Sequence, residues 1–261
     1  MYILFVASKP VNKNKKSIFV ATKKDYPMSN NWFQFKHFNI NQEDCAMKVG
    51  TDSVLLGSWS DIPAGCSVLD IGTGTGVLAL IAAQKGAARV SAVEIDAAAA
   101  AQAARNAADS EWADRIEVVE CDVADYHPDV RFDRILSNPP YFRDSLRSPD
   151  RSRNKARHND TLSYELLAAS AARLLAPDGR LSVILPYESV GQFVRCAKFS
   201  GLYLARRTDV VTVVEQEPKR ALLSFSSAFT QTIADVLYIQ DHDGDESSGY
   251  KALVSDYYLK Y

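Results

Sequence analysis

The chain has 261 residues, of which 47% are hydrophobic and 24% charged, enough for one large domain with a buried core or one domain with a small appendage. This composition excludes a disordered or fibrous protein, and the longest apolar run in the middle, 76–83, is well short of the roughly 20 residues that cross a bilayer, so no membrane partner is expected. The net charge of −2 divides into +5 for residues 1–27 and −7 for the rest, so overall charge gives no support for nucleic-acid binding.

The cysteines indicate a reducing compartment. Cys45, Cys66, Cys121 and Cys196 are far apart in the chain, which gives neither a CxxC pair nor a disulfide framework. Free thiols suit a reducing environment, and the apolar stretch 3–7 is too short for a secretory signal. We therefore expect a cytoplasmic protein.

The N-terminal segment 1–27 differs from the rest of the chain. It is rich in lysine and lacks helical or alternating periodicity, so we expect a poorly ordered basic extension. Alternating aromatic residues begin at Trp32 and predict a strand. Because organised sequence starts there, a further hypothesis is that translation begins at Met28. Residues 28–261 are expected to form a single domain, with a monomer as the default oligomeric state.

From residue 66 onward, apolar runs alternate with helical stretches, which is the pattern of βαβ units. The expected strands are 66–71, 89–95, 115–120, 132–137 and 180–185, and the expected helices are 75–85, 97–108 behind an Asp96 cap, 163–175 and about 188–200. The β-rich runs 202–214 and 220–229 then predict an antiparallel hairpin at the sheet edge, followed by a strand near 235–240. The predicted fold class is α/β, a Rossmann-like seven-stranded sheet that is mostly parallel, with helices on both faces.

The strand at 66–71 runs into a glycine-rich turn, in which Gly72, Gly74 and Gly76 follow Asp70. Glycines at this junction let the backbone approach a ligand, and the next helix offers its N-terminal amides, although a tight βα turn alone would have the same glycines. Glu94 ends the strand that comes next, where a carboxylate can accept from both ribose hydroxyls of an adenosine. Asp122 follows the third strand, where it could accept from an adenine amino group.

The spacing of the glycines distinguishes between adenosine cofactors. A dinucleotide-binding loop has the pattern GxGxxG, whereas this chain has GxGxG behind Asp70. An extra carboxylate is a poor neighbour for a pyrophosphate, but it suits the ammonium and sulfonium groups of S-adenosylmethionine. The run DxGxGxG, followed by an acidic residue at the end of the second strand, resembles the Rossmann-like methyltransferase superfamily over about residues 60–215.

The strand at 132–137 ends in the sequence Asn138-Pro139-Pro140-Tyr141. Two prolines make a rigid turn at the edge where open α/β folds bind ligands, although a plain strand-ending turn is the alternative. The Asn138 side-chain oxygen and the Pro139 carbonyl could accept the protons of a planar amino group, which frees its lone pair to attack a methyl group in line. Tyr141 would stack on the ring, and neither a metal nor a strong base is required.

The flanking sequence narrows the substrate. The segments 33–36 (FQFK), 45–52 (CAMKVGTD) and 55–59 (LLGSW) precede the glycine loop, and a basic stretch ending at His158 and the segment 256–259 (DYYL) follow it. Over about residues 32–260 the chain resembles the bacterial valine-tRNA adenine-37 N6-methyltransferase family, whose pattern begins near Met28. The resemblance implies S-adenosylmethionine binding by the glycine loop, Glu94 and Asp122, catalysis through Asn138 to Tyr141, and an anticodon-loop adenine of tRNA as the substrate.

Thr51 and Asp52 in the segment MKVGTD have two interpretations. They could cap the helix that begins near VLLGSW, with Lys48 as an ordinary solvated lysine. Alternatively, they lie beside the methionine end of the cofactor. We assign them to the cofactor site.

Residues 143–157 leave the catalytic turn directly and carry a net charge of +4 on an acidic body. Charge runs are usually solvated loops, but this one lies where the phosphates of a flipped nucleotide would pass, so we expect it to become ordered on RNA binding. The residues assigned to tRNA binding are Arg143, Arg147, Arg153, Lys155 and Arg157. His37, His127 and His242 are isolated, so no metal site is expected, and 241–249 is predicted to be an acidic loop.

Four other functions share parts of this pattern. A release-factor glutamine N5-methyltransferase uses the same NPPY chemistry but carries a helical domain before its glycine loop, and the segment before Asp70 is short here. A DNA adenine methyltransferase needs a larger target-recognition region than the short segment after Phe229. A nicotinamide oxidoreductase is disfavoured by the loop spacing, and a non-catalytic RNA-binding module by the presence of both motifs.

Overall fold

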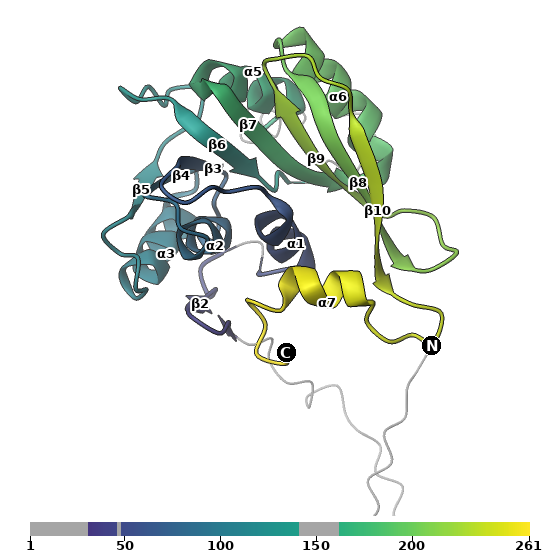
Figure 1. Ribbon diagram of the computed structural model, residues 1–261. Helices are drawn as coiled ribbons and strands as arrows, with labels where there is room; N and C mark the ends of the chain where they lie inside the picture. Colours follow the sequence, from purple (N-terminus) through teal and green to yellow (C-terminus); the bar gives the residue numbers. More distant parts are fainter. Residues whose placement is uncertain (1–30, 46–47, 141–161) are drawn as a thin grey trace, which may run out of the picture. The chain divides into compact units, whose positions relative to one another are not determined.

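A computed structural model describes residues 31–45, 48–140 and 162–261, which are organised around a sheet of eight strands (Figure 1). The strands follow the order β10-β8-β9-β7-β6-β3-β4-β5 across the sheet. They are β3 (Ser67–Ile71), β4 (Arg89–Glu94), β5 (Ile116–Glu120), β6 (Phe132–Ser137), β7 (Leu175–Pro186), β8 (Tyr203–Val213), β9 (Arg220–Ser226) and β10 (Ile233–Gln240).

The strand directions confirm a mostly parallel sheet with an antiparallel hairpin. β3, β4, β5, β6 and β7 pair in parallel, as crossover connections require, while β9 runs antiparallel to both β7 and β8. The sheet has one strand more than the seven expected, because β10 pairs in parallel with β8 from Ile233 beside Arg206 to Gln240 beside Val213.

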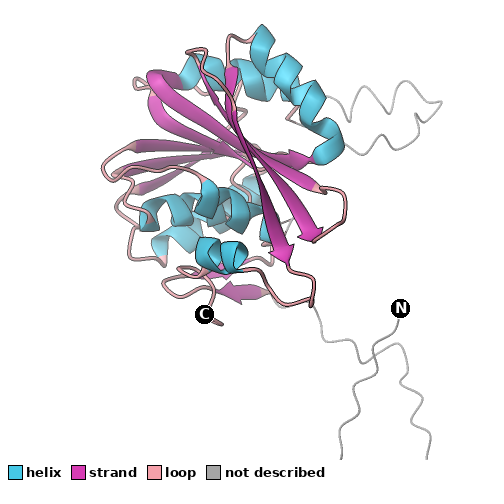
Figure 2. Ribbon diagram, turned by 45° about the vertical axis from the view of Figure 1, so that its right-hand side comes forward, coloured by secondary structure: helices cyan, strands magenta, loops and turns pink. Residues whose placement is uncertain are grey.

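Helices cover both faces of the sheet (Figure 2). They are α1 (Thr51–Trp59), α2 (Val77–Gln84), α3 (Ala97–Ala108), α5 (Tyr164–Leu174), α6 (Val190–Phe199) and α7 (Ser248–Val254), with a short 3-10 helix at Tyr187–Ser189. One core joins α1, α2 and α7 to one face of the sheet, and a second core joins α5 and α6 to the other. Because both faces are covered, the central strands are apolar on both sides: Val68 belongs to the first core and Leu69 to the second. No helix within the described ranges is long and apolar enough to cross a membrane.

Local sequence signals explain the helix ends. The Asp96 side chain caps α3 as expected, accepting from the Ala99 amide at 2.8 Å, and Ser163 caps α5. α5 ends at Leu174, and β7 begins at once at Leu175, earlier than the strand expected at 180. The first residues of β7, 175–179, lie where its pairing with β6 is irregular, between Phe132 and Arg134. Pro177 has no amide proton, and at this irregularity it is not required to donate to the neighbouring strand.

The two ends of the described chain form small elements outside the eight-stranded sheet. β1 (Trp32–Gln34) and β2 (Asn39–Asn41) form a separate antiparallel ribbon, so the strand predicted at Trp32 is present. The acidic segment 241–249 forms a turn, except that Ser248 already begins α7. Residues 1–27 lie outside the described residues, and the basic extension stays a prediction.

Lys85, the C-cap residue of α2, binds the carboxyl end of α1. It follows α2, and its Nζ donates to the carbonyl oxygens of Gly57, Ser58 and Ser60 at 3.3, 2.8 and 2.6 Å. These carbonyls lie in the last turn and just beyond it, where helix geometry leaves acceptors without amide partners. Burial lowers the pKa of Lys85 below its ordinary value.

Replacing Lys85 with methionine is expected to destabilise the protein by about 2 kcal/mol, because partly buried carbonyls lose a charged donor. Urea unfolding followed by circular dichroism measures the change. Lys36→Met, at an exposed lysine between β1 and β2, is the matched control and should change stability by less than about 0.5 kcal/mol. Equal unfolding midpoints for the two variants would contradict the role of Lys85.

Candidate active site

A cavity of about 710 Å³ opens at the carboxyl ends of β3, β4 and β6. β3 lies between β6 and β4: the chain passes from β3 to β4 and β5 on one side and then crosses to β6 on the other side of β3. Such a switch point is where open α/β sheets bind ligands. The cavity lies between the glycine loop and the start of α2 on one side and residues 44–45, 48–49 and 53 and the start of α5 on the other.

The glycine loop takes a backbone conformation that favours glycine. Gly72, Gly74 and Gly76 have φ angles of +72°, +56° and +83°, in the left-handed region. The amides of Gly72 and Thr73 both donate to the Val93 carbonyl of β4, at 2.9 and 3.1 Å. Gly72 and Gly74 line the cavity, while Gly76 lies behind it as the N-cap of α2.

Asp70 lies behind the cavity wall at the end of β3 and is fully buried. Burial raises the pKa of Asp70 to about 7, although the Thr73 hydroxyl, which donates to Oδ2 at 2.5 Å, lowers it. The Ala79 backbone amide lowers this pKa as well, and Oδ1 is buried like Oδ2. The carboxylate therefore supports the loop through Thr73, which does line the cavity.

Two other predicted carboxylates line the cavity directly. Glu94 ends β4, and its Oε2 accepts from the Gly74 amide at 2.9 Å, while Oε1 accepts from the Ile95 and Asp96 amides at 3.0 and 3.1 Å. Asp122 follows β5, and its Oδ1 accepts from the Ala124 amide at 2.9 Å. Backbone amides thus orient both carboxylates at neighbouring strand ends.

Asn138 and Pro140 line the other side of the same cavity, after β6. The Asn138 Nδ2 donates to Ser53 Oγ at 2.9 Å, which fixes the orientation of the carboxamide. Ser137 Oγ donates to the Ile71 carbonyl at 2.8 Å and ties β6 to β3 just before the turn. Tyr141 and the basic residues assigned to tRNA binding, Arg143, Arg147, Arg153, Lys155 and Arg157, lie outside the described residues.

Thr51 and Asp52 do not line the cavity. Thr51 is exposed as the first residue of α1, and the cap position belongs to Gly50. Asp52 instead accepts from Arg220 Nε of β9 at 2.9 Å. The segment MKVGTD does reach the site, but through Lys48 and Val49, together with the following Ser53. The rotation of α1 decides which side chains of this segment face the cavity.

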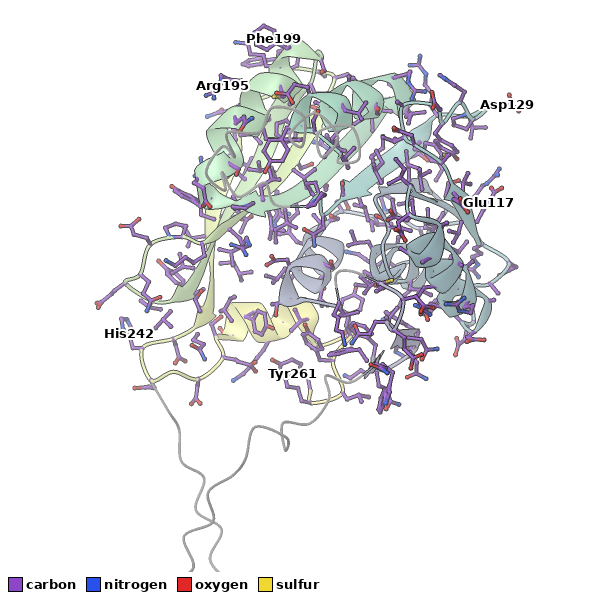
Figure 3. The ribbon with its side chains drawn as sticks, turned by 180° about the vertical axis from the view of Figure 1, so that it is seen from behind. Glu117, Asp129, Arg195, Phe199, His242 and Tyr261 are labelled. Carbon is purple, nitrogen blue, oxygen red and sulfur yellow. The ribbon has the colours of Figure 1, made fainter. Side chains whose placement is uncertain are left out.

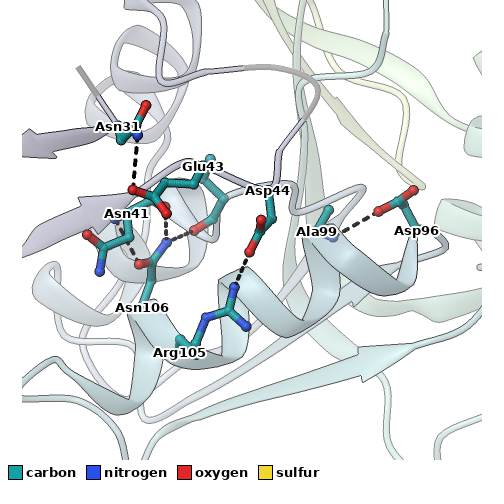
Figure 4. A network of polar contacts seen from close by, with 9 residues as sticks. Asn31, Asn41, Glu43, Asp44, Asp96, Ala99, Arg105 and Asn106 are labelled. Atoms are coloured by element: carbon teal, nitrogen blue, oxygen red, sulfur yellow. Dashed lines mark hydrogen bonds and ion pairs between the residues drawn. The ribbon is translucent and has the colours of Figure 1, made fainter. Parts of the chain in front are cut away.

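A polar network holds the segment before α1 against α3 (Figure 4). Asn106 of α3 accepts from the Asn41 amide at 2.9 Å and donates to the carbonyls of Asn41 and Thr75 at 2.8 and 2.9 Å. Arg105 pairs with Asp44 at 2.6 Å. These contacts could not be predicted from the sequence, where the signal is limited to three polar residues, Gln102, Arg105 and Asn106, inside an alanine-rich helix.

No group of three or more His, Cys, Asp or Glu side chains in the described part of the chain could hold a metal ion. His242 is exposed in the turn after β10 (Figure 3), and His37 and His127 belong to other segments. The geometry thus provides hydrogen-bond acceptors, a glycine-rich loop and an amide group, which suit an organic cofactor and a polar planar substrate.

Known proteins match this chain both in sequence and in fold. A family model described as methyltransferase small domain matches residues 45–215. The tRNA1(Val) (adenine(37)-N6)-methyltransferase of Phocaeicola vulgatus is 47% identical, over 89% of this chain and 99% of that protein. The protein of the same name from Bacteroides fragilis is 44% identical, over 89% of this chain and 100% of that protein.

Two solved structures share the fold at low sequence identity. A predicted O-methyltransferase from Agrobacterium tumefaciens superposes with a TM-score of 0.60 at 22% identity, over 79% of this chain and 96% of that one. A putative RNA methyltransferase from Pyrococcus horikoshii superposes with a TM-score of 0.50 at 20% identity, over 68% and 81% of the two chains. These neighbours establish the fold alone. Identities of 47% and 44% across nearly the whole length of the curated relatives show that the chain belongs to the tRNA1(Val) (adenine(37)-N6)-methyltransferase family.

Proposed function

We propose that the protein is a cytoplasmic enzyme that transfers a methyl group from S-adenosylmethionine to the N6 amino group of adenine 37 in a valine tRNA. The observation that carries this proposal is the cavity in which the glycine loop and Glu94 face Asn138 and Pro140. Relatives that are 47% and 44% identical bear this activity in their names.

The cavity suits S-adenosylmethionine in size and in chemistry. A volume of about 710 Å³ accommodates a ligand of this class. Glu94 offers acceptors to ribose hydroxyls, and Asp122 to the adenine amino group. The buried Asp70 carboxylate is hydrogen-bonded to Thr73 of the glycine turn. Its negative charge favours a cationic ligand at this turn. When bound, the cofactor supplies an electrophilic methyl group.

Asn138 and Pro139 would prepare the amino group of the target adenine. The lone pair of this nitrogen is delocalised into the ring, so the group is a weak nucleophile. Hydrogen bonds from its two protons to the Asn138 Oδ1 and the Pro139 carbonyl favour the pyramidal form, in which the lone pair is available. The hydrogen bond from Asn138 Nδ2 to Ser53 presents the carboxamide in one orientation, which reduces the reorganisation needed at the moment of transfer.

The proton of the methylated amino group leaves without a dedicated base, because the N-methylated cation is strongly acidic. Tyr141 follows the turn in sequence and would stack on the adenine ring. The segment 143–157, with its net charge of +4, would contact tRNA phosphates.

The direct test is methylation of unmodified valine tRNA with labelled S-adenosylmethionine, followed by digestion to nucleosides. We expect label in N6-methyladenosine at position 37, and a loss of at least about 100-fold in rate for Asn138→Ala, because the amino group loses an acceptor in the transition state. His242→Ala, at an exposed residue outside the cavity, is the control and should keep full activity. Label on release-factor glutamine instead of tRNA would overturn the substrate.

Asp70→Asn tests the buried carboxylate without the tRNA. The pKa of Asp70 lies near 7 in the folded protein and at 3.8 ordinarily, so its contribution to stability is lost as pH rises from about 4 to about 7. The asparagine variant escapes this loss, and its Tm without cofactor should exceed that of the parent by at least about 3 °C at pH 8.

The same variant should bind the cationic cofactor about tenfold more weakly at pH 8, because the charge beneath the loop is absent. Thermal denaturation with and without S-adenosylmethionine measures both effects. In the unsubstituted protein, affinity should rise with pH through about 7 as Asp70 ionises. A variant that binds as well as the parent at pH 8 would refute this role.

Replacing both Arg153 and Arg157 with alanine should lower tRNA affinity about tenfold at moderate salt, since two phosphate contacts are lost. Filter binding at several salt concentrations measures the affinity and its salt slope, and the slope should decrease by about 2. Arg195→Ala, on the exposed face of α6, is the control. An unchanged salt slope would show that the segment is an ordinary solvated loop.

A further inference from the structure

One ion pair links the first turn of α1 to the hairpin of β8 and β9. The Arg220 Nε donates to Asp52 Oδ2 at 2.9 Å, and Arg220 Nη1 donates to the Lys219 carbonyl at 3.0 Å. The Arg220 and Asp52 side chains are 33% and 24% exposed, so the pair is shielded on most sides. It is therefore better protected from solvent than a fully exposed pair.

Arg220 lies at the same sheet edge as the cavity. It is the first residue of β9 and is paired in register with Pro186, the last residue of β7. β7 is parallel to β6, with Val183 beside Ser137, so the end of β7 lies at the edge where β6 delivers Asn138. The ion pair thus connects the cavity edge of the sheet, at Arg220, to the first turn of α1, at Asp52.

The turn that Asp52 anchors also touches the catalytic asparagine. Ser53 follows Asp52 in the chain, and its Oγ accepts from Asn138 Nδ2 at 2.9 Å. The N-cap of α1 is Gly50, which has no side chain that could accept a hydrogen bond from the first turn. This helix end lacks an internal capping side chain, so tertiary contacts determine its position.

Both ends of α1 are then held by cations from other elements. Lys85 binds carbonyls at and just beyond its carboxyl end, and Arg220 pairs with Asp52 in its first turn. An acidic side chain in the first turn is also favoured by the helix dipole. The helix is fixed along its axis, and Ser53 is fixed with it.

We propose that the Asp52–Arg220 ion pair is a positioning clamp for catalysis: it holds the first turn of α1 so that Ser53 keeps the Asn138 carboxamide in its reactive orientation. Asp52 and Arg220 are positioning residues and act through Asn138. The inference rests on the proposed function, in which Asn138 accepts from the target amino group.

The test is a double-mutant cycle with Asp52→Asn, Arg220→Gln and the two combined. Each single variant should lower the single-turnover methylation rate about fivefold at saturating S-adenosylmethionine and tRNA, the upper range for such an ion pair. The affinity for S-adenosylmethionine should stay within about twofold. The combined variant should also lose about fivefold, since the first change has already broken the ion pair.

The matched control is Arg89→Gln, which breaks the exposed Arg89–Glu117 pair at 2.9 Å and should leave the rate unchanged. Losses that multiply to about 25-fold in the combined variant, or single variants with parental rates, would overturn the clamp. So would a weaker tRNA affinity with a smaller salt slope in Arg220→Gln alone, which would make Arg220 a phosphate contact.

Asn138→Ala, measured in the same experiment, distinguishes a failure of the proposed clamp from a failure of the proposed chemistry. If it loses methylation while Asp52→Asn keeps the parental rate, only the clamp is wrong. If Asn138→Ala keeps full methylation, the proposed chemistry is wrong as well, and a rate loss in Asp52→Asn would have another cause.

Discussion

The buried carboxylate of Asp70 is the constraint around which the cavity is arranged. Taking a carboxylate out of water costs several kcal/mol unless partners compensate, and here burial raises its pKa to about 7. The chain holds it at the end of the central strand β3, with a hydroxyl from Thr73 as a hydrogen-bond donor. The glycine turn follows directly after this group, and three of its residues take left-handed φ angles, which glycine adopts without strain.

The remaining parts of the cavity depend on the position of that turn. Gly72 and Thr73 are bound to β4 through the Val93 carbonyl, and the Glu94 carboxylate accepts from Gly74. Because β3 is bordered by β4 on one side and β6 on the other, the same turn faces Asn138 after β6. A parallel sheet with a switch point therefore brings together groups that lie far apart in the sequence.

The sequence predicted the elements better than the contacts between them. The strands around 66–71, 89–95, 115–120 and 132–137 match the structure to within one residue at each end, because apolar runs and glycine turns delimit them locally. The role of Lys85 at the end of α1 and of Arg220 beside Asp52 could not be predicted. Such contacts depend on how separate helices and strands pack, and no local periodicity encodes that.

In the candidate site too, the sequence predicted positions along the chain better than the contacts between side chains. Of the residues predicted from the motifs, Gly72, Gly74, Glu94, Asp122 and Asn138 line the cavity, and their roles there stay predictions. Asp70 and Gly76 lie behind the wall, and Thr51 and Asp52 face away from it, since side-chain direction follows from the pleat of β3 and the rotation of α1. The hydrogen bond from Asn138 to Ser53 joins residues far apart in the chain, and nothing in the local sequence signals it.

The Asp52–Arg220 pair joins a residue inside the segment that the family model matches to one outside it. The family match covers residues 45–215 and so includes Asp52 and most of the cavity, whereas Arg220 lies beyond it. The Asp52–Arg220 pair therefore ties a strand outside the matched range to the helix that contacts Asn138. If the pair acts as proposed, a change at the start of β9 reaches the reacting group through Asp52, Ser53 and Asn138.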